Sequence, residues 1–304
     1  MLKRLDFFVP EEWEEPLSGL ADSFGVQFFC SPEITETTGS EENIAFTGFT
    51  TFSLLVSREE QPVERIQRRF CAFLDENQVT YRQTEIDYAD NEDWMQQFRL
   101  AFTPIVVDDH VIVRPPWADP LADETPDKTV ILIDPGMAFG TGTHETTRLC
   151  LQFLSQVTLG TPPTGGGGYL DIGAGSGILA FYLLKKGATP VTAIELDGPA
   201  VENLRKNADL NQLSERLAVV CGDLRDFTPT GPISGICANL TSPVLLENFH
   251  RFHRWLAPSG WAIFSGVNST NVGEVKRGLA GLSWVLTDEK QEGEWHALLV
   301  KKSG

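Results

Sequence analysis

The chain has 304 residues, of which 41% are hydrophobic, and a formal net charge of −18. This length allows two domains, and neither a bilayer-spanning apolar run nor a signal-peptide core is recognised, so we expect a cytoplasmic protein without a membrane role. The excess of acids disfavours direct nucleic-acid binding, which needs clustered Lys and Arg, and fits either a basic protein partner or a need for solubility.

The cysteines indicate neither disulfides nor metal binding. They are odd in number, far apart and without a Cys-x-x-Cys pair: Cys30, Cys71, Cys150, Cys221 and Cys237. Such spacing predicts reduced and mostly packed thiols, and we expect no metal site.

Residues 1–90 are predicted to form a small α+β domain. Alternating and helical apolar periodicities indicate six elements in the order βαββαβ: Leu2–Val9, Glu11–Phe24, Gly25–Cys30, Ile44–Val56, Pro62–Asn77 and Tyr81–Tyr88. This order is typical of the split-βαβ, ferredoxin-like fold. No catalytic constellation falls in it, so a recognition module is favoured over a structural appendage.

A charged and aromatic segment is expected to link the two domains. Trp94, Phe98 and Phe102 recur at a spacing of four, which predicts a linker helix over 91–103. A hairpin with strands Pro104–Val107 and Val111–Arg114 follows, and it begins the second domain, 104–304.

A glycine-rich loop follows the apolar strand that begins at Val130. Gly136, Gly140 and Gly142 lie in this loop, and a helix is expected to begin near Thr143 as its N-cap. Glycines and hydroxyls directly before a helix are suited to bringing backbone close to a small molecule or to another strand.

A second glycine-rich turn lies in the stretch from Tyr169 to Ala180. Gly173, Gly175 and Gly177 follow a short apolar strand and precede a helix, so the backbone can approach a ligand there. Glu195 ends the next strand, 24 residues after Asp171, at the distance where a carboxylate accepts from ribose hydroxyls.

The rest of the second domain alternates strands and helices, as in a doubly wound parallel sheet. Strand ends carry Asp223 and the amide Asn239, which would lie with Glu195 at the carboxyl edge, where ligands bind. The last two strands, Trp284–Lys290 and Trp295–Lys301, are joined too closely for a parallel crossover and must form an antiparallel hairpin.

Two features favour S-adenosylmethionine over a nicotinamide cofactor. The glycines follow the pattern Gly-x-Gly-x-Gly after Asp171, and the sheet closes with an antiparallel hairpin. Methyl transfer to an amine is a direct displacement, so it needs alignment and exclusion of water rather than a triad or a metal.

Three segments together closely resemble the ribosomal protein L-11 methyltransferases, the PrmA family: Asp134–Thr147, Asp171–Ala180 and Ala238–Leu240. The resemblance runs from about Asp93 to the last residue. It implies a seven-stranded Rossmann-like methyltransferase domain and an N-terminal ferredoxin-like domain that grips the substrate. It also implies methyl transfer from S-adenosylmethionine to the N-terminal amine and lysine side chains of ribosomal protein L-11.

The resemblance also implies site residues. By position, Thr147, Gly173, Glu195 and Asn239 would contact S-adenosylmethionine, while Phe139 and Thr141 would belong to the loop that covers it. Asp171 and Gly175 join this set through the turn itself, and Asn239 would orient the methyl and the incoming amine. Glu195 stands where the family usually has aspartate.

Other functions stay open at this point. A protein-lysine methyltransferase of another basic substrate, a nicotinamide-dependent oxidoreductase and a non-catalytic binding protein with the same fold are the alternatives. We expect a monomer.

Overall fold

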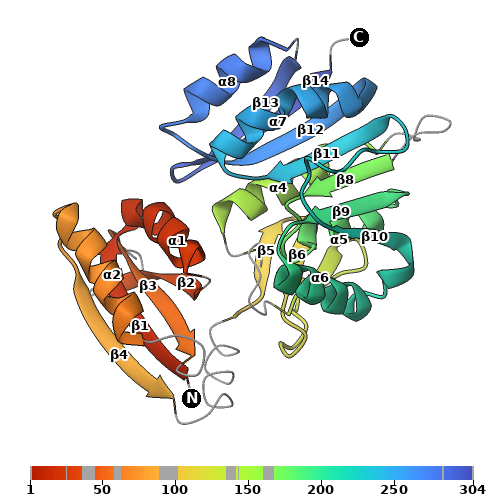
Figure 1. Ribbon diagram of the computed structural model, residues 1–304. Helices are drawn as coiled ribbons and strands as arrows, with labels where there is room; N and C mark the ends of the chain where they lie inside the picture. Colours follow the sequence, from red (N-terminus) through yellow and green to blue (C-terminus); the bar gives the residue numbers. More distant parts are fainter. Residues whose placement is uncertain are drawn as a thin grey trace. The chain divides into compact units, whose positions relative to one another are not determined.

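The computed structural model describes residues 2–24, 26–35, 45–57, 63–88, 102–134, 142, 144–159, 168–282 and 284–302. The chain divides into two compact units, Met1–Ala101 and Phe102–Gly304 (Figure 1). In the described ranges no helix combines the length and apolarity needed to cross a bilayer. The expected linker helix, 91–103, falls almost entirely outside the described residues.

The described residues of the first unit form a four-stranded antiparallel sheet in the order β2-β3-β1-β4 and two α-helices. Its elements are β1 Leu2–Pro10, the 3₁₀ helix η1 Glu11–Trp13, α1 Glu14–Ser23, β2 Gln27–Thr35, β3 Ala45–Ser57, α2 Val63–Glu76 and β4 Arg82–Tyr88. The first and third strands are central, as in the ferredoxin-like fold, so the βαββαβ prediction is confirmed.

The core of the first unit follows from the two periodicities. Leu5 and Phe7 lie two apart in β1 and are buried, while α2 buries residues three or four apart, including Ile66 and Phe70. The rings of Phe7 and Phe70 stack with centroids 5.5 Å apart. One face of the sheet and one stripe of the helix therefore form a single core.

The first helix begins later than predicted, and Pro16 explains the difference. A helix starting at Glu11 would place Pro16 in its interior, where the ring clashes with the carbonyl four residues earlier. Instead, Glu11–Trp13 forms a 3₁₀ turn and α1 begins at Glu14, so Pro16 falls in the first helical turn, where no hydrogen bond is lost.

The second unit contains a seven-stranded sheet and a smaller three-stranded one. Its elements are β5 Ile105–Asp108, β6 Val111–Arg114, β7 Thr129–Leu132, α4 Glu145–Gln156, β8 Gly168–Ile172, α5 Ile178–Lys185, β9 Val191–Glu195, α6 Gly198–Leu210, η2 Ser214–Arg216, β10 Leu217–Cys221, β11 Ile233–Asn239, α7 Ser242–Trp255, β12 Leu256–Asn268, α8 Val272–Ala280, β13 Trp284–Glu292 and β14 Trp295–Lys302.

The large sheet has the order β10-β9-β8-β11-β12-β14-β13. The first five strands in this order are parallel, and β14 pairs antiparallel with both β12 and β13. The doubly wound sheet and its closing hairpin are thus as predicted. The small sheet, β5-β6-β7, contains the expected β5–β6 hairpin, with β7 added parallel to β6.

Helices cover both faces of the large sheet (Figure 1). Side chains of α4, α5 and α6 pack on one face of the sheet, against Tyr169 and the other strand residues that point to that face. Side chains of α7 and α8 pack on the opposite face, against Leu170 and the strand residues that point the other way. Because neighbouring strand residues point to opposite faces, both must be apolar in a sheet covered on two sides. This requirement accounts for the continuous apolar runs of the inner strands.

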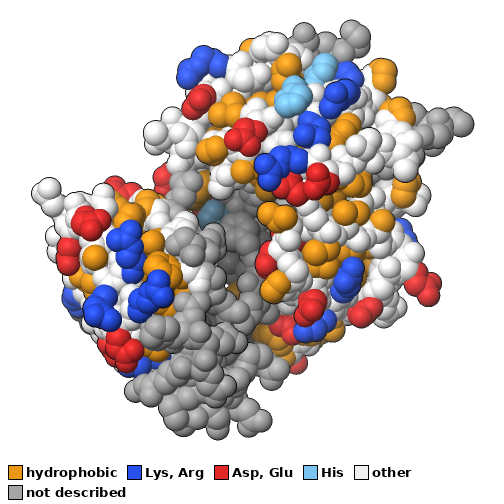
Figure 2. All heavy atoms as spheres, viewed as in Figure 1, with side chains coloured by type: hydrophobic (Ala, Val, Ile, Leu, Met, Phe, Trp, Pro, Cys, Tyr) orange, Lys and Arg blue, Asp and Glu red, His pale blue; other side chains and the backbone are white. Residues whose placement is uncertain are grey.

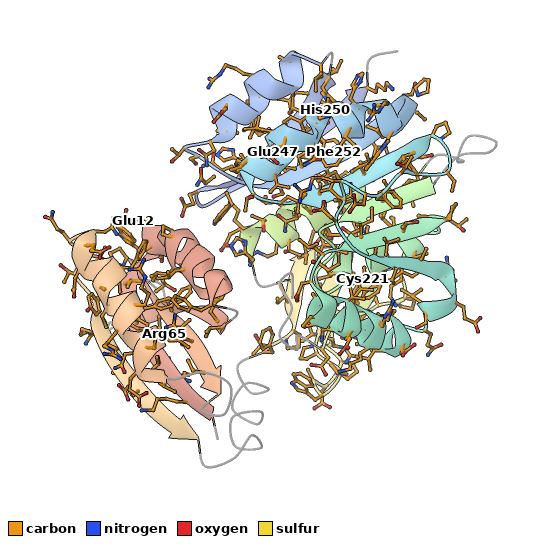
Figure 3. All side chains as sticks on the ribbon, viewed as in Figure 1. Glu12, Arg65, Cys221, Glu247, His250 and Phe252 are labelled. Atoms are coloured by element: carbon orange, nitrogen blue, oxygen red, sulfur yellow. The ribbon has the colours of Figure 1, made fainter. Side chains whose placement is uncertain are left out.

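Phe252 of α7 provides a test of this packing. It is fully buried against Trp255 and Phe264, whereas His250, on the same helix, is exposed (Figure 3). Phe252→Ala should lower the free energy of unfolding by about 3–5 kcal/mol, because a cavity replaces the ring. His250→Ala, the control, should change it by less than about 0.5 kcal/mol. Urea denaturation measures both, and equal effects would contradict the packing described.

Candidate active site

The turn after β8 uses glycines where side chains cannot fit. Gly173 has φ +68°, and a Cβ there would lie 2.4 Å from the Leu240 side chain. Gly177 has φ +87°, and a Cβ would lie 2.6 Å from the ring of Phe181. The turn is held to the next strand by N–H groups of Gly173 and Ala174, which donate to the Ile194 carbonyl over 2.9 and 3.1 Å. The backbone is therefore fixed at this point, and neighbouring side chains leave room there only for glycine.

Asp171 supports the turn from inside the protein. It is 1% exposed, and its Oδ2 accepts from the backbone N–H of Ala180, 2.9 Å away in α5. Burial raises the pKa of Asp171 to about 8, with a smaller contribution from the charge of Glu195. This carboxyl therefore holds the start of α5 rather than facing the sheet edge.

Glu195 lies at the end of β9, beside the turn. Its Oε2 accepts from the N–H of Gly175 over 2.8 Å, and its Oε1 accepts from the N–H groups of Leu196 and Asp197 over 2.8 and 3.0 Å. A carboxylate has about four acceptor positions, so one remains, on Oε2. The added methylene of glutamate thus lets the carboxylate reach across to the turn.

Leu196 is a residue that the sequence analysis did not select. Its side chain is 67% exposed, although the strand before it is largely buried. The signal available in the sequence was a large apolar residue directly after a strand-end acid. An apolar surface beside a carboxylate suits a ligand with a flat ring next to a sugar.

Asn239, at the end of β11, is oriented by the first turn of α4. Its Nδ2 donates to Oγ1 of Thr146 over 3.1 Å and lies 3.5 Å from Oγ1 of Thr147. Both threonines are buried. Because the amide N–H group is used in this way, the carbonyl oxygen Oδ1 is the atom that Asn239 can offer to a ligand.

His144 is the N-cap of α4, where Thr143 was predicted. Its Nδ1 accepts from the backbone N–H of Thr146 over 3.3 Å and lies 2.8 Å from Oγ1 of the same residue. Burial lowers the pKa of His144, so the ring is neutral at pH 7. Because Nδ1 is then an acceptor, the Thr146 hydroxyl donates its hydrogen to the ring. A lone pair of Oγ1 accepts from the Asn239 amide.

The β13–β14 hairpin meets the same helix end. Arg148 donates to Glu292 over 2.6 Å and to Glu145 over 3.1 Å, and the Trp295 ring lies edge-on to His144 with centroids 5.0 Å apart. Trp295 is half-buried. It therefore packs at the helix start that carries Thr146.

Other candidate residues have different surroundings. Phe139 and Thr141 lie outside the described residues. The Asp223 carboxylate is bound by the Arg225 guanidinium and backbone N–H over 2.5 to 3.0 Å, and these bonds lower its pKa to about 2.

The cysteines differ in exposure, and α7 carries a basic face. Cys150 and Cys237 are buried, whereas Cys221 at the end of β10 is exposed (Figure 3). In Figure 2, histidine side chains lie beside Lys and Arg on the second unit, where α7 carries His250 and His253. Among the described residues, no three His, Cys, Asp or Glu side chains are grouped to hold a metal ion.

The sequence model of the family described as Ribosomal protein L11 methyltransferase (PrmA) matches residues 23–303. The chain belongs to this family. The match covers most of both units, so the family resemblance and the α/β methyltransferase fold are confirmed, and with them the expected methyl donor, S-adenosylmethionine.

Individual L11 methyltransferases are similar over different lengths. That of Gloeobacter violaceus is 38% identical over 215 residues, which are 70% of this chain and 64% of that protein. That of Pelobacter propionicus is 29% identical over 303 residues, 97% of this chain and 96% of that protein. A crystal structure of ribosomal protein L11 methylase from Lactobacillus delbrueckii subsp. bulgaricus matches with a TM-score of 0.60 and 27% identity, over 67% of this chain and 100% of that one.

The buried carboxyl of Asp171 predicts a pH dependence of stability. With a pKa of about 8 in the folded protein and roughly 3.9 when unfolded, it binds a proton in the folded state that the unfolded chain releases. Its contribution to stability is therefore lost as the pH rises from about 4 to about 8. Asp171→Asn cannot ionise, so its free energy of unfolding relative to the wild type should rise across this window.

Thermal unfolding at about pH 5 and about pH 8.5 measures this difference. Asp223→Asn is the control, because a carboxyl with a pKa of about 2 stays ionised at both values. A difference between Asp171→Asn and the wild type that does not change with pH would show that Asp171 is already ionised at pH 5.

Proposed function

We propose that this protein transfers methyl groups from S-adenosylmethionine to the N-terminal amine and lysine side chains of ribosomal protein L11. The observation that carries the proposal is the meeting of the Gly173 turn, Glu195 and Asn239 at one edge of the sheet, with a defined amide orientation at Asn239. The names of the similar proteins supply the substrate.

The residues at this edge fit the methyl donor. The backbone of Gly173 and Gly175 would lie against it, the remaining acceptor position of Glu195 would take one ribose hydroxyl, and exposed Leu196 would cover the adenine. Asp171 would act indirectly by holding the turn. Thr147, in the first turn of α4, would contact the cofactor. When bound, S-adenosylmethionine supplies a methyl group on a positively charged sulfur.

Asn239 would align the substrate amine. A neutral amine has N–H groups to donate and one lone pair for the reaction. An acceptor such as Oδ1 would hold an N–H group and so direct the lone pair toward the methyl. The threonine hydroxyl behind Nδ2 keeps the amide from turning its donor side to the amine.

The two units would divide the work. The ferredoxin-like domain, 1–90, would bind the protein substrate, a linker over 91–103 would connect it, and the methyltransferase domain, 104–304, would carry the chemistry. A net charge of −18 favours a basic partner such as a ribosomal protein and disfavours nucleic acid. A cytoplasmic monomer without a membrane role is part of the same proposal.

Methylation of L11 by the full-length protein tests the reaction. Intact-mass measurement should show gains of whole methyl units that require S-adenosylmethionine. Asn239→Ala should lower kcat about 100-fold, because alignment of the amine is lost. Asn248→Ala, which removes another mostly buried amide, on α7, is the matched control and should keep the wild-type kcat.

The outcomes separate the alternatives. Cofactor binding without methylation of L11 would favour another basic protein as substrate, or a non-catalytic role. Binding of NAD but not S-adenosylmethionine would refute the proposal. Equal kcat for Asn239→Ala and the wild type would remove Asn239 from the mechanism.

Removing the first unit tests the division of work. A chain that begins at Phe102 should bind S-adenosylmethionine with wild-type affinity but should no longer methylate L11, because its docking surface is gone. Calorimetric cofactor binding measures the first effect and also shows that the shortened chain is folded. Unchanged methylation of L11 would contradict the recognition role of residues 1–90.

A further inference from the structure

Helix α6 and its C-cap carry three asparagines at a spacing of four residues: Asn203, Asn207 and, at the cap, Asn211. Asn207 is 0% exposed, and Asn211 is nearly as buried. Burying an amide costs free energy unless its donors and acceptor are all paired. A row of buried amides on one helix face therefore indicates a specific set of partners.

The partners are backbone groups at the outer edge of β7. Asn211 pairs with both backbone groups of Leu132, accepting from its N–H over 3.0 Å and donating to its carbonyl over 2.6 Å. Asn207 does the same with Asp134, over 2.8 and 3.2 Å. The other edge of β7 faces β6, where the N–H of Ile133 donates to Arg114.

The geometry of the two elements makes this pairing regular. Four residues of an α-helix rise about 6.0 Å, and two residues of a strand about 6.6 Å. Amides at 207 and 211 can thus meet alternate residues of a strand as a neighbouring strand would. We call Asn207 and Asn211 the amide ladder.

Asn207 makes two contacts that Asn211 does not, the first from Nδ2 to Oδ1 of Asn203 over 3.1 Å and the second at the glycine turn. Its Nδ2 lies 3.2 Å from the carbonyl oxygen of Ser176, in the glycine turn after β8. β7 belongs to the small sheet and β8 to the large one. A single buried side chain therefore joins the end of β7 to the turn, although the two lie in different sheets.

We propose that Asn207 is a positioning residue for the cofactor, and that it acts by fixing Asp134 and the Gly173–Gly177 turn at one mutual distance. This inference rests on the proposed function, in which the turn lies against S-adenosylmethionine. Asn203 adds a bond to the Asp134 carbonyl over 3.2 Å and strengthens the same end of the ladder. Asn211 binds β7 at Leu132, two residues before Asp134 and farther from the turn, and has a structural role.

Matched substitutions on α6 test the inference in the full-length protein. Asn207→Ala should raise the Kd for S-adenosylmethionine about tenfold, the equivalent of about 1.4 kcal/mol. Both substitutions should lower the melting temperature to a similar extent, but Asn211→Ala should leave the Kd for S-adenosylmethionine unchanged. The KM for L11 should stay the same in both variants, because the ladder belongs to the second unit and L11 is proposed to bind the first.

The results distinguish this inference from the function on which it rests. A wild-type protein that fails to bind S-adenosylmethionine would overturn the proposed function. Wild-type binding with equal affinities for wild type and Asn207→Ala would overturn only the role of Asn207. Equal weakening by Asn207→Ala and Asn211→Ala would show general loosening and would also overturn it.

A second variant serves if Asn207→Ala does not fold. Asn207→Asp keeps the shape and the acceptor for the Asp134 N–H but, when ionised, has no donor for the Ser176 carbonyl. Its cofactor affinity should be lower than that of the wild type and should recover as the pH falls, because the protonated carboxyl can donate. A pH dependence identical to that of the wild type would contradict the proposal.

Discussion

The parallel pairing of β9, β8 and β11 is the constraint on which the site depends. Ile172 lies opposite Ile194 on one side and Ala238 on the other, so the next residue of each strand or turn stands at the same level. Register in a buried sheet is fixed by apolar side chains on both faces. The polar groups of the site are placed by residues that take no part in its chemistry.

Glu195 and Asn239, at this edge, are each oriented by hydrogen bonds to the protein itself. The Glu195 carboxylate accepts from three backbone N–H groups, and the Asn239 amide donates to a buried threonine. Groups held in this way lose little freedom when a ligand arrives. Of these two described side chains, one acceptor position on Glu195 and the carbonyl oxygen of Asn239 remain for the ligand.

Much of the fold could be predicted because it depends on local patterns. The Gly173 turn, the alternation of strands and helices and the closing hairpin all follow from neighbouring residues. Features set by tertiary contacts could not. By sequence either Thr143 or His144 could cap α4, and in the structure the His144 ring accepts from the Thr146 N–H.

The contacts of Asn207 show the same limit more strongly. An asparagine on a helix is unremarkable by itself, and its partner Asp134 lies 73 residues earlier. The spacing of the three asparagines was the only local sign. Asp223 was similarly ambiguous, since a strand-end acid serves a ligand or a nearby arginine equally well, and here it binds Arg225.

The series of hydrogen bonds from Asn239 through Thr146 to His144 runs in one direction, and this has a consequence for selectivity. A site that ends in a carbonyl oxygen repels groups that bring only lone pairs, such as carboxylates, and accepts groups that bring N–H. An acidic side chain at the same place would meet oxygen against oxygen. The neutral His144 ring orients the Thr146 hydroxyl, and this hydroxyl orients the Asn239 amide. In the proposed role of Asn239, these contacts therefore favour methylation of nitrogen over methylation of a carboxyl group.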